Sequence, residues 1–121
     1  GELLVIVGDR TPPAESGRVV TADFLGAPAL FPQGPFILAA LLECPVFLFV
    51  CAHEQRGYCV HFEPFAERIE LPRGRREAAI AVYAQRYADR LAVLCQRAPF
   101  QWFNFFDFWA GADSARARQF P

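Results

Sequence analysis

The longest apolar stretch of the chain, Pro35–Ala52, constrains the fold most, because it is long enough to raise the question of a membrane span. Glu43 and Pro45 divide it into two pieces of about ten residues or fewer, each short of the ~20 residues that a spanning helix needs. Pro35 suits the first turn of a helix, where its missing N–H is not required, and Pro45 ends that helix. We therefore expect a buried helix followed by a buried strand, and no membrane-spanning segment.

The rest of the chain alternates between short apolar runs and segments rich in proline or glycine. Short apolar runs predict strands buried on both faces, and apolar residues three and four apart predict a long helix near the C-terminal end. Pro28, Pro32 and two glycines predict irregular structure through most of Gly26–Gly34. The expected strands are Leu3–Val7, Arg18–Leu25, Val46–His53 and Tyr58–Phe62, and the expected helices are Pro35–Cys44 and Arg75–Arg97.

This order of elements predicts an α/β fold, with a small mixed sheet of about four strands and two main helices. The helix between the second and third strands permits one right-handed parallel crossover. A length of 121 residues suits a single domain, and 54% hydrophobic residues exclude a disordered chain. A net charge of -1 argues against a nucleic-acid partner. The four cysteines are widely spaced, which favours free thiols in a reducing compartment.

Gly8-Asp9-Arg10 follows the first apolar run, at the point where that run meets a loop. Ligands of open α/β sheets gather beyond the carboxyl ends of strands, so polar residues here are well placed for binding. Arg10 can bind a phosphate or a carboxylate through its planar fork of donors. In the alternative interpretation, Asp9 caps the turn and Arg10 pairs with it.

Phe31-Pro32-Gln33-Gly34 precedes the first helix. Free backbone N–H groups at a helix N-terminus can face an anion or an acyl oxygen. The spacing alone favours the simpler interpretation, in which the segment only starts the helix. No serine lies in a G-x-S-x-G turn, no glycine-rich phosphate loop is present, and no cofactor is expected.

Two Cys-x-His pairs lie on the two arms of one predicted hairpin. If the turn has three residues, all four side chains point to one face, and two cysteines with two histidines are a zinc ligand set. A change of register by one residue sends them to opposite faces, and the competing interpretation is core cysteines with a half-exposed histidine. The candidate ligands are Cys51, His53, Cys59 and His61.

The segment Pro99–Trp109 is the most aromatic part of the chain, with seven aromatic residues among eleven. Such a run covers every side of a helix or a strand, so it cannot all face one core. We expect part of it to meet a membrane interface, a partner or another part of a larger protein. The candidate contact residues are Trp102, Phe105, Phe106 and Trp109, within an aromatic-rich C-terminal segment over 99–121.

Several segments together resemble the C-terminal half of bacterial lipid A biosynthesis acyltransferases, the lauroyl/myristoyl transferases of the lysophospholipid acyltransferase superfamily. The resemblance covers Leu3 to about Trp109. It is carried by the order and spacing of the segments Gly8-Asp9-Arg10, Val19-Val20, Phe24-Leu25-Gly26, Phe31-Pro32-Gln33-Gly34, Pro45-Val46 and Pro99-Phe100-Gln101-Trp102.

The resemblance implies an enzyme of lipopolysaccharide synthesis, peripheral to the cytoplasmic face of the inner membrane, of which this chain is a soluble fragment. It would move a fatty acyl group from acyl carrier protein or coenzyme A to a hydroxyl of a lipid or glycolipid. The residues assigned to contact with the acceptor or its head group are Asp9, Arg10, Phe31, Pro32 and Gly34. The fold would then be part of a larger acyltransferase α/β domain.

In that family a His and an Asp or Glu separated by four residues form the catalytic base, and neither histidine here begins such a motif. Tyr58 stands five residues after His53, and Ala66 five residues after His61. The resemblance places the motif upstream of Gly1, and the absence of Met also suggests a piece of a longer protein. We therefore expect no catalytic residue here and no activity from the fragment alone. The alternative is a non-catalytic α/β module that binds a membrane or a partner.

Overall fold

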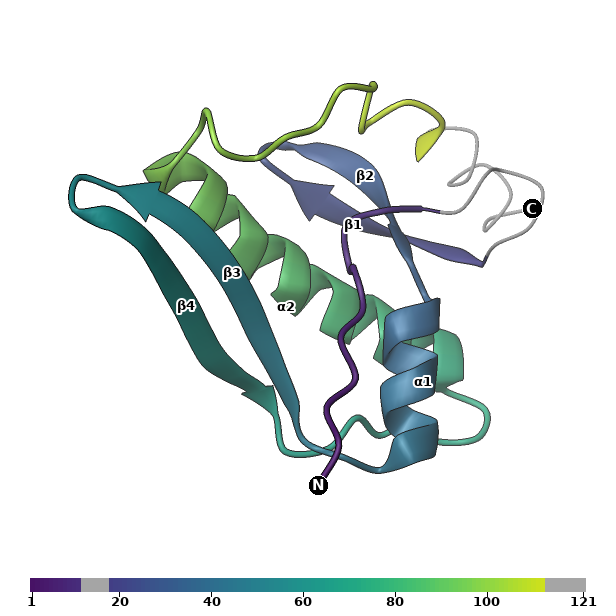
Figure 1. Ribbon diagram of the computed structural model, residues 1–121. Helices are drawn as coiled ribbons and strands as arrows, with labels where there is room; N and C mark the ends of the chain where they lie inside the picture. The colour runs from purple at the N-terminus through teal and green to yellow at the C-terminus, as the bar shows by residue number, and fades with distance from the viewer. Residues whose placement is uncertain (12–17, 113–121) are drawn as a thin grey trace.

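The computed structural model describes residues 1–11 and 18–112. Four strands and two helices follow in the order β1 (Val19–Phe24), β2 (Ala27–Pro32), α1 (Gly34–Leu42), β3 (Val46–Glu54), β4 (Gly57–Ala66) and α2 (Arg76–Arg97). Figure 1 shows the strands as two separate hairpins, with α2 running between them. The number of strands and helices agrees with the expectation, but β2 takes the place of the expected strand Leu3–Val7. The strands form two antiparallel sheets instead of one mixed sheet, and the described residues contain no parallel pair.

Strand β2 (Ala27–Pro32) occupies most of residues 26–34 and pairs with β1, so the expectation of irregular structure there is wrong. Leu25 (φ 50°) and Gly26 (φ 90°) make its two-residue turn, and positive φ at both positions matches the twist of the strands. Pro28 lies opposite Asp23, whose N–H and C=O both bond to a glutamine side chain of α2. Proline at this position therefore removes no hydrogen bond between the strands.

The hydrophobic core lies between the β1–β2 hairpin and one face of α2, and Phe36 of α1 completes it. The face of α2 that the periodicity predicts is the buried one, with Ile80, Leu91 and Cys95 in the core. Ala84 and Ala88 are fully buried, and their small side chains let α2 approach β1 closely. Within the described residues, neither helix combines the length and the apolar character needed to cross a membrane.

The β3–β4 hairpin has two different faces, so β3 is only half buried. The inner face meets α2, where Arg90 Nε donates to Glu63 Oε1 at 2.7 Å. The outer face carries large apolar side chains that no other described segment covers. The exposed fraction is between 46% and 60% for each of its large apolar residues, Phe47, Phe49, Val60 and Phe62.

Leu3–Val7 is not the buried strand that its composition predicts. Its five side chains are between 51% and 96% exposed, and no strand is assigned within residues 1–11. In Figure 1 this segment passes between β3 and α1 without joining either sheet. Apolar, β-branched residues favour a buried strand. A strand also needs the backbone of a neighbouring strand for its hydrogen bonds, and no described segment provides one here.

Candidate functional site

Asp9 and Arg10 form the centre of a hydrogen-bonded group that joins the two ends of the described chain. Arg10 Nη1 donates to Asp9 Oδ2 at 2.8 Å, and Arg10 Nη2 donates to the Phe103 carbonyl at 2.7 Å. Trp102 Nε1 donates to the same Asp9 oxygen at 2.9 Å. The pairing of Asp9 with Arg10 is thus present, while 41% of the Arg10 side chain stays open to solvent.

Gly8 holds this group against α2. A Cβ at Gly8 would lie 2.9 Å from Tyr87 Cζ, closer than real Cβ contacts, so any larger residue here would require the Tyr87 ring to shift. Burial, and after it the charge of Asp9, raises the pKa of the Tyr87 phenol well above its ordinary value. The phenol therefore stays neutral beside Asp9.

A pocket of about 550 Å³ lies between β3, the C-terminal part of α2 and the segment that follows it. Gln101 attaches that segment to the free edge of β3, because its amide donates to the His53 carbonyl at 2.7 Å and accepts from the His53 N–H at 2.6 Å. The apolar lining includes Val50, Ala52, Leu91, Leu94, Ala98, Pro99 and Trp102, and the polar lining includes Glu54, His61 and Arg97.

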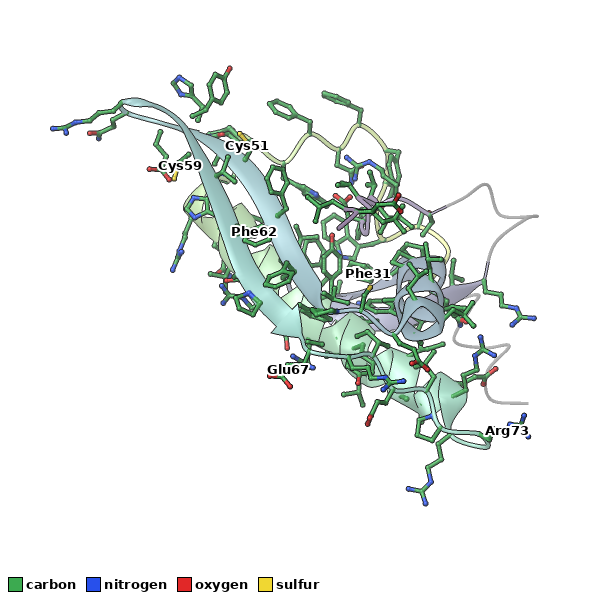
Figure 2. All side chains as sticks on the ribbon, turned by 60° about the horizontal axis from the view of Figure 1, so that its bottom comes forward. Phe31, Cys51, Cys59, Phe62, Glu67 and Arg73 are labelled. Atoms are coloured by element: carbon green, nitrogen blue, oxygen red, sulfur yellow. The ribbon has the colours of Figure 1, made fainter. Side chains whose placement is uncertain are left out.

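The proposed zinc set of two cysteines and two histidines does not share one face, so that prediction is wrong. The turn has two residues instead of three, with Glu54 opposite Gly57, and this shifts the register by one. Cys51 and His53 point to the outer face. Cys59 and His61 point to the inner face, and Figure 2 shows the two labelled cysteines on the hairpin near its turn.

The turn end of the inner face holds a different cluster of polar groups. His61 Nε2 lies 3.1 Å from Glu54 Oε1, and Cys59 is close to both. Sequence reasoning missed Glu54, because the three-residue turn placed it on the wrong face. A two-residue turn with Gly57 at positive φ would have revealed it, since alternation then puts Glu54, Cys59 and His61 on one side.

The segment before α1 contributes mainly to the core. Phe31 is fully buried and its ring meets that of Tyr87 edge to face, and Pro32 is buried as well. Gln33 Nε2 donates to the Val19 carbonyl at 2.9 Å, which ties the segment to β1. Of the three acceptor-side residues expected here, Phe31 and Pro32 are buried and only Gly34, at the start of α1, is exposed to solvent.

The aromatic segment after α2 divides into inward and outward side chains. Trp102 and Trp109 pack against the core, and Trp109 Nε1 donates to the Phe24 carbonyl at 3.0 Å. Of the four expected contact residues, Phe105 and Phe106 lie at the surface, 92% and 52% exposed. Residues 113–121, the remainder of the predicted C-terminal segment, lie outside the described residues.

Comparison of the chain with protein-family models, with curated proteins and with solved structures found no match in any of the three. The functional assignment below therefore depends on the residues and on their geometry.

Proposed function

We propose that this chain forms the substrate-side half of an acyltransferase of the lipid A biosynthesis type. The position of Trp102 is the observation that supports this most directly. Its side chain donates to Asp9 and the residue lines the apolar pocket, so a space suited to an acyl chain adjoins the Asp9–Arg10 pair. The pocket would hold the fatty acyl chain, and Arg10 would meet the head group of a lipid or glycolipid acceptor.

The size and lining of the pocket suit this role. Its volume of about 550 Å³ lies within the ~300–1,000 Å³ of typical small-molecule sites. Each methylene buried against such a lining contributes about 0.8 kcal/mol to binding. The donor would be a fatty acyl group on acyl carrier protein or coenzyme A. The base that activates the acceptor hydroxyl is assigned to a segment outside residues 1–121, in a protein attached to the cytoplasmic face of the bacterial inner membrane.

Binding of a fatty acyl chain tests the pocket directly. Displacement of a fluorescent fatty acid by lauroyl-coenzyme A would be measured for the unaltered protein and for Ala98→Trp, which places an indole in the pocket wall. We expect the variant to lose about tenfold or more in affinity, since an excluded chain loses several methylenes of burial. Ala78→Trp on the exposed first turn of α2 is the control. Equal affinity in both variants would show that the acyl chain does not bind in this pocket.

The acceptor side is tested in the chain extended at its N-terminus to include a His-x4-Asp/Glu motif. Arg10→Gln should lower the rate of acyl transfer to the lipid acceptor and raise its Michaelis constant, because an exposed cation is lost next to the pocket. Arg73→Gln is a matched control on an exposed linker, at the other end of the molecule from the labelled cysteines in Figure 2. Unchanged kinetics for Arg10→Gln would show that Arg10 does not contact the acceptor.

A second candidate function, a module that binds a membrane or a partner, is favoured by the outward aromatic side chains. Phe100 and Phe105 are 93% and 92% exposed, and aromatic rings are favoured at the bilayer interface. Co-sedimentation with phospholipid vesicles should fall for the double variant Phe100→Ser/Phe105→Ser. Point substitutions are preferable to deletion of the segment, because deletion would also remove Trp102 and Phe108 from the core. Val82→Ser on α2, also an exposed apolar side chain, is the control, and an equal loss there would contradict this candidate.

A further inference from the structure

Three side chains with metal-binding atoms share the inner face of the β3–β4 hairpin at its turn. Cys59 and His61 are two residues apart on β4, which places them on the same face. Their partners across the sheet are Ala52 and Val50, and Glu54 lies two residues beyond Ala52 on the same face of β3. The register of the hairpin thus brings a thiol, an imidazole and a carboxylate to one place.

The distances between these groups are close to those of a metal site. One donor atom from each of the three lies within 4.8 Å of the other two, and His61 Nε2 and Glu54 Oε1 are 3.1 Å apart. Tetrahedral zinc, with bonds of about 2.0–2.3 Å, separates its donor atoms by about 3.3–3.7 Å. The separations in the structure are therefore close to that range, with the His61–Glu54 pair slightly shorter and none longer than 4.8 Å.

The chemical types of the three ligand atoms decide which metal ion the site favours. A thiolate and an imidazole favour zinc over calcium or magnesium, which prefer sites made only of oxygen ligands. A thiolate and a carboxylate also balance the charge of a divalent cation. Cys59 and His61 are partly buried while Glu54 is exposed, so an ion can enter from solvent and still be shielded on one side.

We propose that Glu54, Cys59 and His61 bind one Zn²⁺ at the turn end of the β3–β4 hairpin. Three protein ligands leave a fourth position for water or for a ligand, as in zinc sites that act in catalysis. Glu54 and His61 also line the pocket of about 550 Å³, so this fourth position lies beside it. The site is independent of the acyltransferase proposal and stands whether or not the chain takes part in acyl transfer.

Metal titration of the purified, metal-stripped protein tests the site. Calorimetry with Zn²⁺ should show one ion bound per chain, and Co²⁺ should give the absorption of a tetrahedral site with a thiolate-to-metal charge-transfer band. Cys59→Ser and His61→Asn should each weaken Zn²⁺ binding by about tenfold or more, since even outer-shell changes cost that much. Cys51→Ser and His53→Asn are matched controls, because they change the same residue types on the other face of the same hairpin.

The controls separate this site from non-specific binding. Absence of saturable Zn²⁺ binding, or an equal loss in Cys51→Ser and Cys59→Ser, would overturn the proposal. Circular dichroism checks that each variant folds. Should Cys59→Ser fail to fold, the Co²⁺ spectrum of the unaltered protein decides the thiolate ligand, and Glu54→Gln decides the carboxylate. A Co²⁺ spectrum without the charge-transfer band excludes Cys59 and ends the proposal.

Discussion

At the scale of single residues, Gly8 and Trp102 show how the Asp9–Arg10 pair is kept in position. Gly8 allows the backbone to approach the Tyr87 ring, and Trp102 donates the only N–H of its side chain to Asp9. Asp9 in turn accepts from Arg10, so the orientation of the guanidinium is set by groups from both ends of the described chain. Each contact depends on its neighbours, which makes the group sensitive to single substitutions.

Gly8→Ala should destabilise the protein by about 1–3 kcal/mol, the usual cost of inserting a methyl group where there is no room. The added Cβ would lie 2.9 Å from Tyr87 Cζ, and an aromatic ring attached to α2 has little freedom to move away. Urea unfolding measures the change. Gly34→Ala is the control, because nothing lies within 4 Å of a Cβ there. Equal stability of the two variants would show that Gly8 and Tyr87 are further apart than described.

At the scale of elements, α2 connects the two hairpins by different kinds of contact. It packs against β1 through fully buried alanines, and it holds β4 through the Arg90–Glu63 ion pair on a partly exposed surface. The first contact depends on the small volume of the side chains, and the second combines charge with the packing of Phe65 against Tyr83. The two hairpins should therefore respond to different perturbations.

Ala84→Leu should lower the stability by about 1–3 kcal/mol, because α2 would have to move away from β1 to admit the larger side chain. For a domain of this size, that corresponds to a fall of several degrees in Tm for each kcal/mol. Thermal unfolding followed by circular dichroism measures it. Ala78→Leu, on the exposed side of α2, should leave Tm nearly unchanged. A similar fall in both variants would argue against close packing at Ala84.

The Glu63 ion pair should make stability depend on pH. The hydrogen bond from Arg90 holds the pKa of the Glu63 carboxyl below its ordinary value of 4.5. A carboxyl whose pKa is lowered in the folded state stabilises the protein at every pH above its ordinary pKa. This contribution is lost as the pH falls through the folded-state pKa. Tm of Glu63→Gln should therefore be lower than that of the unaltered protein at neutral pH, and the difference should vanish in acid. Arg90→Gln should behave alike, and a difference that persists in acid would contradict the ion pair.

At the scale of the whole molecule, a large apolar surface stays outside the core. The outer face of the β3–β4 hairpin exposes Phe49 and Phe62, and the Leu3–Val7 segment is exposed as well. Soluble monomers rarely show contiguous apolar patches of more than a few hundred Å², and larger ones mark interaction surfaces. The core of this fold is centred on α2 and the β1–β2 hairpin, and Phe65 of β4 joins it, while the outer face of the β3–β4 hairpin takes no part.

Replacing Phe49 and Phe62 by Thr should reduce the binding of the dye ANS while changing stability by less than about 1 kcal/mol. The two side chains are more than half exposed, and threonine retains a preference for strands. Dye fluorescence and urea unfolding measure the two effects. Sedimentation velocity provides the check: a large loss of stability together with dissociation of an oligomer would show that the face is covered in solution.

Local patterns in the sequence determined the helices and most of the strands. The spacing of Ile80, Leu91 and Cys95 predicts both the existence and the buried face of α2, because helical periodicity depends only on near neighbours. Pro35 and Pro45 bracket α1 for the same kind of reason, since proline acts on its own backbone and on the residue before it.

Only the tertiary structure decided that β2 pairs with β1, where the register of the predicted β3–β4 hairpin lies and which aromatic rings face inward. Leu3–Val7 has the composition of a buried strand but no neighbour, and a turn shorter by one residue moved Cys51 to the other face from Cys59. Trp102 packs against Phe24 and Phe108, and Asp9, 93 residues away, accepts its N–H. The register of a hairpin and the burial of a side chain depend on contacts with other segments. Composition and periodicity describe each segment alone, so they determine what a segment tends to form and leave its partner undecided.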